Sequence, residues 1–202
     1  MRADPAAAAI RTVAEREPTL DALREPLVNC TACVELAGTR THVVPGEFPA
    51  AASLLLVGEA PGAQEDELGR PFVGKGGRLL DEILAAAGLH RHEVAVANVL
   101  KCRPPRNRQP TRGEAQRCTG WLDRQVVLAD PDVVVTLGTT AMSWALGTGL
   151  RLIDVRGRVH PWRDRRLVPT YHPSAALRFG PRGAPMAALR EDIRLAASLV
   201  PA

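Results

Sequence analysis

The sequence predicts one α/β domain, in which a mostly parallel sheet is covered by helices on both faces. Short apolar runs at residues 53–57, 93–99 and 132–137 have the length and pattern of strands. Helix-like stretches separate them, and strands that alternate with helices favour parallel pairing. The 202 residues match the size of a single domain, and neither an internal repeat nor a low-complexity linker divides them.

The first half of the chain is predicted to hold an N-terminal segment, one strand and one helix. Residues 1–26 are expected to be helical or loose, ahead of a single domain that spans residues 27–202. Residues 30–49 are rich in turn formers and are expected to be irregular. The run at 53–57 predicts a buried strand, and after a loop with several glycines the apolar stripe at 78–89 predicts a helix.

The second half repeats the alternation of strands and helices. Thr111 and Glu114 have the spacing of a capping box, so a helix is expected from there to about Leu128. Five other stretches carry strand or helix patterns. Residues 93–99 and 132–137 are expected as strands, the stretch after Gly138 as a helix, residues 151–170 as short strands with turns, and residues 184–199 as a helix.

Composition and charge indicate where in the cell the protein is located and which kind of partner it binds. No run of about 18 apolar residues occurs, so no transmembrane helix is expected. The N-terminus lacks the apolar core of a signal peptide, which predicts a cytoplasmic protein without a membrane partner. The net charge of +4 is compatible with nucleic acid, and 24 of the 26 basic residues are arginines. Arginine suits phosphate, but GC-rich codon usage gives the same bias.

Three segments are expected at the carboxyl ends of strands, where open parallel sheets bind their ligands. They are the loop from Gly58 to Gly62 with the carboxylate of Glu59, the stretch at Asn98, and the segment that begins with Tyr171 and His172. Taken singly, each segment is also compatible with an ordinary turn. Together they predict a binding site at one edge of the sheet.

Two loops add groups that suit nucleic acid. Phe72 stands in a loop between Pro71 and Val73, where it either stacks on a base or folds back over the core. The run from Lys101 to Arg112 holds five positive charges and no acid. That run is either a solvated loop or a contact for phosphates.

Four cysteines favour a metal site. Cys30 and Cys33 form a C-x2-C pair, and Cys102 and Cys118 lie at the two ends of the basic loop and the helix after it. A disulfide framework is not expected in a cytoplasmic chain. Four thiolates suit either zinc or an iron–sulfur cluster, and their spacing does not choose between the two.

Four motifs and the first cysteine pair together resemble one known family. GEAPGAQED, GRPFVGKGG, NVLKCRPPRNRQP and YHPSAALR occur in the order of the family-four, or thermostable-type, uracil-DNA glycosylases, over residues 27–200. This resemblance implies a central four-stranded parallel sheet flanked by helices, and a [4Fe–4S] cluster in preference to zinc. It also implies base-excision repair, in which uracil is flipped out of DNA and its N-glycosidic bond is hydrolysed to leave an abasic site.

The resemblance assigns roles to single residues. Phe72 would stack on uracil, Asn98 would hydrogen-bond to its Watson–Crick edge, and His172 would stabilise negative charge at uracil O2. Glu59 would position water or stabilise the cationic sugar, and Glu65 would crowd the C5 position and disfavour thymine. The cluster ligands would be Cys30, Cys33, Cys102 and Cys118.

The remaining expected contacts come from the loops. The backbone at Gly58 and Ala60 is expected to approach uracil. Contacts with DNA are expected from Arg103, Arg106, Arg108, Ser174, Leu177 and Arg178. Leu177 and Arg178 are alternatives for the wedge that fills the gap left by the flipped base. We expect a monomer that acts on uracil-containing DNA.

Two other functions are compatible with parts of the sequence. A relative that traps uracil-DNA covalently would carry a histidine in the inserted basic loop, but residues 102–110 contain none. A non-catalytic iron–sulfur DNA-binding module would explain the cysteines and arginines. It would not explain why Phe72, Asn98 and His172 occur together.

Overall fold

Five strands form one sheet, ordered β2-β1-β3-β5-β4, in the computed structural model, which describes residues 4–201. The strands are β1 Leu54–Gly58, β2 Ala95–Asn98, β3 Val133–Leu137, β4 His160–Trp162 and β5 Arg165–Thr170. Strands β2, β1, β3 and β5 are parallel, whereas β4 pairs antiparallel with β5. Every residue of β1, β2 and β3 is buried, as expected for parallel strands covered on both faces.

The expected number of four strands is wrong, because β4 adds a fifth. The four-stranded parallel part is present, and the antiparallel hairpin of β4 and β5 extends it at one edge. The turn of this hairpin contains Arg163 and Asp164, which both have positive φ values, of 48° and 61°. Two-residue turns of this kind are usually marked by Asn-Gly or Asp-Gly, so an Arg-Asp pair gives no sequence signal for the hairpin.

Ten α-helices surround the sheet within residues 4–201. They are α1 Pro5–Arg16, α2 Leu20–Val28, α3 Val34–Thr39, α4 Ala63–Leu68, α5 Lys75–Ala86, α6 Arg112–Ala129, α7 Thr139–Leu146, α8 Leu152–Val155, α9 Pro173–Phe179 and α10 Ala184–Ala197. Two short 3-10 helices, η1 Arg91–Glu93 and η2 Pro105–Asn107, lie in the loops. None of the helices in this part of the chain is long and apolar enough to cross a membrane.

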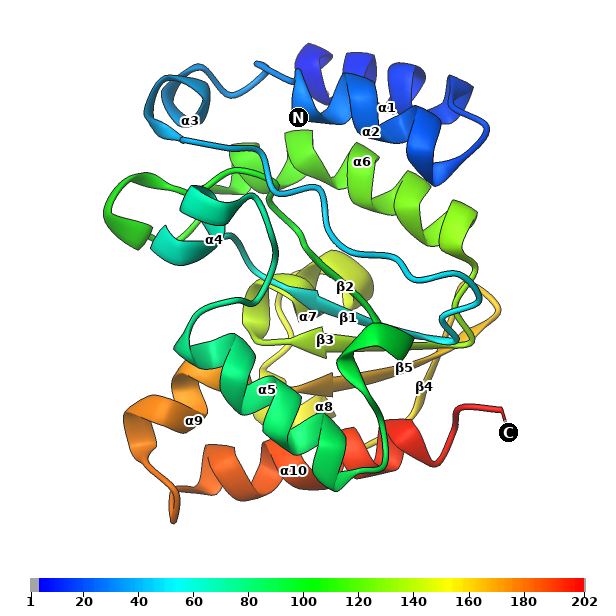
Figure 1. Cartoon of the computed structure of the whole chain (residues 1–202), viewed down its shortest axis with the longest axis vertical. Helices are drawn as coiled ribbons and strands as arrows, with labels where there is room; N and C mark the ends of the chain where they lie inside the picture. The colour runs from blue at the N-terminus through cyan, green and yellow to red at the C-terminus, as the bar shows by residue number, and fades with distance from the viewer. Residues whose placement is uncertain (1–3, 202) are drawn as a thin grey trace.

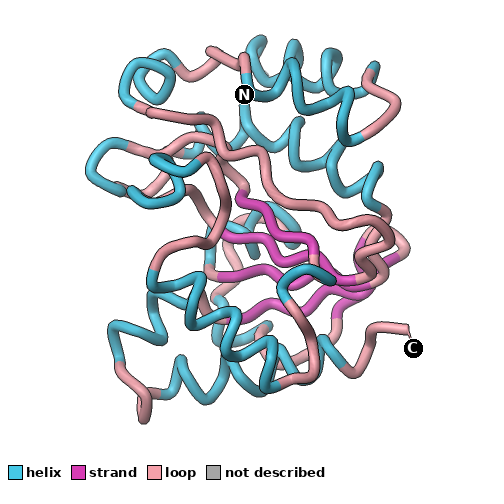
Figure 2. The backbone as a smooth tube through the Cα atoms, viewed as in Figure 1, coloured by secondary structure: helices cyan, strands magenta, loops and turns pink. Residues whose placement is uncertain are grey.

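The sheet separates two apolar layers. Figure 1 shows α1, α2 and α6 on one side of the sheet and α5, α9 and α10 on the other, and Figure 2 shows the strands as the middle layer. Successive side chains of a strand point to opposite faces. Leu55 therefore packs in the core cluster that contains Trp121 of α6, and Leu56 packs in the cluster that contains Leu189 of α10.

The helix signals at the main elements are confirmed, and the shortest helices were missed. The capping box of α6 is present, because Thr111 Oγ1 accepts the Glu114 N–H and the Glu114 carboxylate accepts the Thr111 N–H. Helix α3 lies in a segment expected to be irregular, α4 in an expected loop, and α8 in a stretch expected to form strands. Helices of four to six residues are too short to show an apolar period.

The N-terminal helices pack onto α6. Ile10 and Ala14 of α1 are buried in the same core cluster as the sheet residue Leu55. Asp4 Oδ2 accepts a hydrogen bond of 2.7 Å from Arg117 Nε on α6. Helices α1 and α6 approach each other closely at Gly120, since a Cβ built there would lie 3.0 Å from Ile10 Cγ2 and 3.2 Å from the Arg11 backbone nitrogen.

Replacing Gly120 by leucine should therefore push α1 off α6 and lower the free energy of unfolding by about 1–3 kcal/mol. The matched control is Gly113→Leu on the same helix, where a Cβ meets nothing within 4 Å. That variant should unfold at the wild-type urea concentration or above it, because leucine is the better helix former. Equal midpoints for both variants would contradict the close packing of α1.

Candidate active site

A cleft of about 370 Å³ opens at the carboxyl ends of the parallel strands. This volume lies in the range of small-molecule sites. The loop after β1, the end of β2 and the segment after β5 all reach it, as the strand order predicts. Eight of the predicted site residues line the cleft: Glu59, Ala60, Glu65, Phe72, Asn98, Arg108, His172 and Ser174.

Gly58 allows two of these side chains to meet. A Cβ built on Gly58 would lie 2.4 Å from Asn98 Oδ1 and 2.5 Å from Phe72 Cζ. Any other residue would force one of the two away. The predicted role of Gly58 was a backbone that approaches the ligand, whereas the observed contact is with the side chains of Asn98 and Phe72.

Phe72 forms one wall of the cleft and is also part of the core. Its side chain is 7% exposed and packs in the same apolar cluster as Leu80. Its φ is +53°, a conformation that costs energy for a residue with a side chain. This conformation requires glycine at position 77, because a Cβ built on Gly77 would lie 1.7 Å from the Phe72 carbonyl oxygen. The two predicted alternatives, stacking and core packing, are thus compatible with each other.

Asn98 brings an unpaired polar atom to the cleft. Its side chain is 2% exposed, and no group in residues 4–201 hydrogen-bonds to its Oδ1. Buried polar atoms are normally paired, since an unpaired one costs about 1–3 kcal/mol. An unpaired amide oxygen at a cleft wall therefore indicates a ligand that donates a hydrogen bond.

His172 is held as a neutral ring with one defined proton. The backbone N–H of Ser174 donates to His172 Nδ1 at 3.1 Å, and Ser174 Oγ lies 2.8 Å from the same atom. Because Nδ1 accepts, the proton of the neutral ring is on Nε2. The surrounding protein lowers the pKa of His172 to about 4 by desolvation, and the Glu65 charge opposes this only in part. The ring therefore offers one N–H donor near neutral pH.

Two carboxylates are fixed by other parts of the fold. Glu65 accepts backbone N–H groups from Gly62 at 3.1 Å, Val73 at 3.0 Å and Gly74 at 2.8 Å. It thus ties the loop after β1 to the loop that carries Phe72. Glu59 accepts a hydrogen bond from Thr140 Oγ1 on α7.

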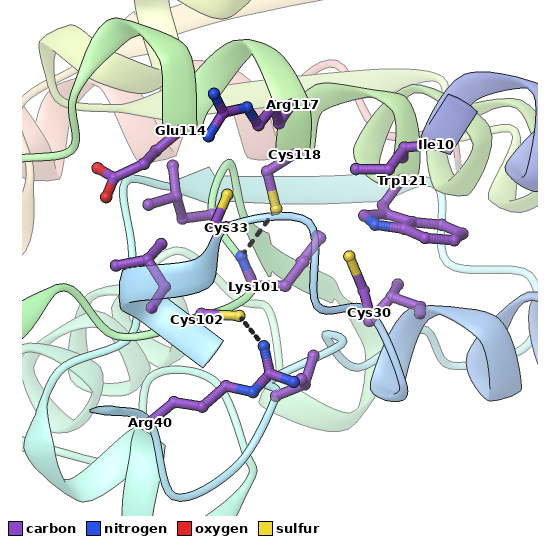
Figure 3. Close-up of a pocket in the computed structure, with 14 residues that line it drawn as sticks. Ile10, Cys30, Cys33, Arg40, Lys101, Cys102, Glu114, Arg117, Cys118 and Trp121 are labelled. Atoms are coloured by element: carbon purple, nitrogen blue, oxygen red, sulfur yellow. Dashed lines mark hydrogen bonds between the residues drawn. The ribbon is translucent and has the colours of Figure 1, made fainter. Parts of the chain in front are cut away.

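The four cysteines lie around a second pocket, between α2, α3 and α6 (Figure 3). All four are free thiols. Arg40 Nη1 donates to Cys102 Sγ, and the Lys101 backbone N–H donates to Cys118 Sγ, both at 3.2 Å. Burial raises the pKa of the Cys33, Cys102 and Cys118 thiols, that of Cys118 to about 12. Within residues 4–201, no three His, Cys, Asp or Glu side chains are arranged to hold a single metal ion.

Comparison with known proteins identifies the family. The model of the uracil DNA glycosylase superfamily matches residues 45–194. A type-4 uracil-DNA glycosylase of Thermotoga maritima is 43% identical over 81% of this chain and 85% of its own length. The chain belongs to the type-4 uracil-DNA glycosylases. Type-4 enzymes of Sulfurisphaera tokodaii and Archaeoglobus fulgidus are each 40% identical over 79% of the chain, and over 76% and 83% of their own lengths. The resemblance predicted from the motifs is confirmed.

The basic side chains of the loop from Lys101 to Arg112 make more contacts within the protein than the composition of the loop suggested. Lys101 was counted among the charges for phosphate, but its side chain is buried. Arg108 pairs with Glu35 at 2.9 Å and with Glu114 at 2.7 Å, and this pairing lowers the pKa of Glu114 to about 2. Arg103 donates to Asn107.

Other residues that were predicted to contact DNA lie outside the cleft. Arg106 is exposed in the loop, and Leu177 and Arg178 are exposed on α9. The residues in or beside the cleft that sequence reasoning missed include Gln64, Lys75, Pro104, Asn107 and Thr140. Lys75 had a signal, since it directly follows the Phe72 loop, whereas the others are loop or helix residues without a pattern.

Titration of His172 provides a test of the site in this type-4 glycosylase. Its ring should stay neutral from pH 8 down to about pH 5 and take up a proton only near pH 4. The unfolded chain protonates this histidine near pH 6.5, so the contribution of His172 to stability is complete above pH 6.5 and falls as the pH drops toward 4. Ring nitrogen NMR measures the pKa directly, and His172→Gln identifies the signal. A midpoint near 6.5 would contradict the desolvated, neutral ring.

Proposed function

We propose that this chain flips uracil out of DNA and hydrolyses its N-glycosidic bond, leaving an abasic site. The observation that carries the proposal is the unpaired Asn98 oxygen, buried at the wall of a cleft that Phe72 and His172 also line. A base inside a duplex cannot reach such a cleft, so the enzyme must extrude the nucleotide. Membership of the type-4 family supports the same reaction.

Phe72 and Asn98 recognise the base. Uracil stacks on the Phe72 ring, a contact that contributes about 1–3 kcal/mol per base. The N3–H of uracil donates to the free Asn98 Oδ1, and the Asn98 amide N–H donates to uracil O4. Cytosine has no N3–H and carries an amino group in place of O4, so the same carboxamide orientation rejects it.

The remaining residues of the site act on the charges that develop as the glycosidic bond breaks. Breaking the bond leaves negative charge on uracil and positive charge on the sugar. The Nε2–H of His172 donates to uracil O2 as the negative charge develops, and a donor fixed before the reaction needs no reorganisation. Glu59, fixed by Thr140, faces the sugar side and positions water or stabilises the cation.

Glu65 shapes the pocket for uracil over thymine. Its carboxylate is fixed by three backbone N–H groups. A rigid wall formed by Glu65 leaves no space for the C5 methyl group of thymine. Gly58 and Ala60 bring the backbone close to the base.

DNA lies across the mouth of the cleft in this proposal. Arg103, Arg106 and Lys75 contact phosphates, and Arg108 holds the basic loop through its two carboxylate partners. Leu177, which is 44% exposed on the helix that begins after His172, fills the gap left by the flipped base. Ser174 and Arg178 contact the backbone beside it.

We place a [4Fe–4S] cluster at Cys30, Cys33, Cys102 and Cys118. Four thiols around one pocket fit it, and Arg40 and Arg117 supply positive charge beside the sulfurs. In a four-iron cluster each thiolate binds a different iron, so the sulfurs stand farther apart than around one zinc ion. Bound by these four cysteines, a cluster would link the basic loop to α2 and α3. Four free thiols suit the cytoplasm, where we place the protein as a monomer.

The reaction is tested with purified protein and oligonucleotides that contain one uracil, single-stranded and double-stranded. Free uracil and an alkali-labile abasic site are the expected products. Asn98→Ala should lower the rate about 10²–10³-fold, since it removes hydrogen bonds to the reacting base. Asn29→Ala, at the exposed end of α2, is the matched control and should keep wild-type activity. A protein with its cluster intact that releases no uracil would overturn the proposal, and a heat-stable protein–DNA adduct would favour covalent trapping.

The cofactor has its own test. Purified protein should be brown, with a broad absorption band in the visible blue, and should contain iron and acid-labile sulfide. Cys118→Ser should lose most of the band, because Cys118 is one of the four ligands. A colourless protein that contains stoichiometric zinc would show that the cysteines hold zinc.

A further inference from the structure

A lysine is buried between the cleft and the cysteine pocket. Lys101 is 1% exposed and is one of the largest fully buried side chains in the described residues. Its ammonium group donates to the carbonyl oxygen of Asn98 at 2.8 Å and to Gln125 Oε1 at 2.6 Å. Lysine is rarely buried without a partner that requires it, so these two contacts need an explanation.

The carbonyl of Asn98 needs a donor from outside the sheet. Strand β2 is the edge strand next to β1, and on its outer side Glu47 and Val96 exchange backbone hydrogen bonds of 2.8 Å in an antiparallel bridge. If this register continued by two residues on each strand, Pro45 would lie opposite Asn98, but the bridge ends at Glu47 and Val96. Proline has no N–H, so the hydrogen bond that the Asn98 carbonyl would receive there is missing.

The side chains of Lys101 and Gln125 supply hydrogen bonds to the two carbonyl groups that the backbone leaves without a donor here. The Lys101 side chain donates to the Asn98 carbonyl, and the Gln125 amide donates to the Pro45 carbonyl at 2.7 Å. The two side chains are themselves joined, and the Lys101 carbonyl accepts the Val44 N–H at 2.7 Å. The end of β2 is thus held by a closed polar network. An amine donates in either protonation state, so the network does not depend on the charge of Lys101.

We propose that Lys101 is a positioning residue for base recognition, whose side chain replaces the missing strand hydrogen bond and thereby fixes the Asn98 carboxamide against Phe72. This inference rests on the proposed role of Asn98 in reading uracil. Gln125 lies on α6, the helix that also carries Cys118, and the Lys101 N–H donates to Cys118 Sγ. The segment from Asn98 to Cys102 is therefore held in place by α6 and by the cysteine pocket. Its position in turn fixes the position of Asn98 in the cleft.

The test replaces Lys101 by methionine, which keeps much of the apolar volume and removes the donor. Lys101→Met should lower kcat/KM on uracil-containing DNA about tenfold to a hundredfold, as expected when a reacting group is misplaced. The matched control is Arg156→Met. Arg156 is a largely buried cation bonded to Asp192 on the far helix α10, so its loss should lower stability and leave kcat/KM unchanged.

A double-mutant cycle separates positioning from general destabilisation. If Lys101 acts through Asn98, Lys101→Met should cost less than about twofold in the Asn98→Ala background. Hydrogen exchange of the amides in residues 95–100 gives a readout that needs no activity. In Lys101→Met these amides should speed up more than those of β1 and β3, whereas Arg156→Met should speed up all three strands alike. The visible absorption of each variant reports whether the cysteine site stays loaded.

Wild-type activity of Lys101→Met, an equal loss in both backgrounds, or unchanged exchange at residues 95–100 would each overturn the inference. Gln125→Met removes one partner of the same network and carries the same prediction at a smaller size, so a poorly folded Lys101→Met does not prevent the test. An inactive wild type would overturn the proposed function instead, and the exchange measurement would still test whether Lys101 fixes the end of β2.

Discussion

The candidate site depends on β1 ending in a residue without a side chain. Gly58 occupies a position where Asn98 arrives from the neighbouring strand and Phe72 from a loop. Its carbonyl accepts the Val99 N–H, so the backbone at this point is held by the sheet and cannot move to make room. The side chains proposed to read the base are therefore fixed by the centre of the fold, whereas the residues proposed to contact DNA lie on loops and on α9.

The cleft and the cysteine pocket share one short piece of backbone. Asn98 lines the first, Cys102 lines the second, and Lys101 lies between them with hydrogen bonds toward both. Buried polar networks are tolerated only when their members are satisfied, because an unpaired group costs more than the bond returns. The same segment of backbone therefore connects the cysteine pocket to the position of Asn98 at the end of β2.

The sequence predicted the parts of the site that follow from topology. Glu59, Asn98 and His172 were expected together because the carboxyl ends of parallel strands meet at one edge, and the structure brings them to one cleft. The capping box at Thr111 was predictable because it is local. Short strands with turns were expected over residues 151–170, and β4 and β5 lie there, but the position of the turn at Arg163 was not predictable, since it lacks the usual residues. Lys101 was expected in a loop that is either solvated or in contact with phosphates, but it is buried, with Asn98 O and Gln125 Oε1 as acceptors that only the tertiary fold brings to it.

The distribution of charge fits a reaction that separates charge. The arginines near the cleft are paired or peripheral: Arg108 binds two carboxylates and Arg103 binds an amide. The cation of Lys101 lies beside the end of β2 and is occupied by its two acceptors. At His172, negative charge on a departing uracil would meet a neutral N–H dipole. A neutral donor stabilises the anion as it forms without binding anions beforehand, so stabilisation is strongest at the transition state.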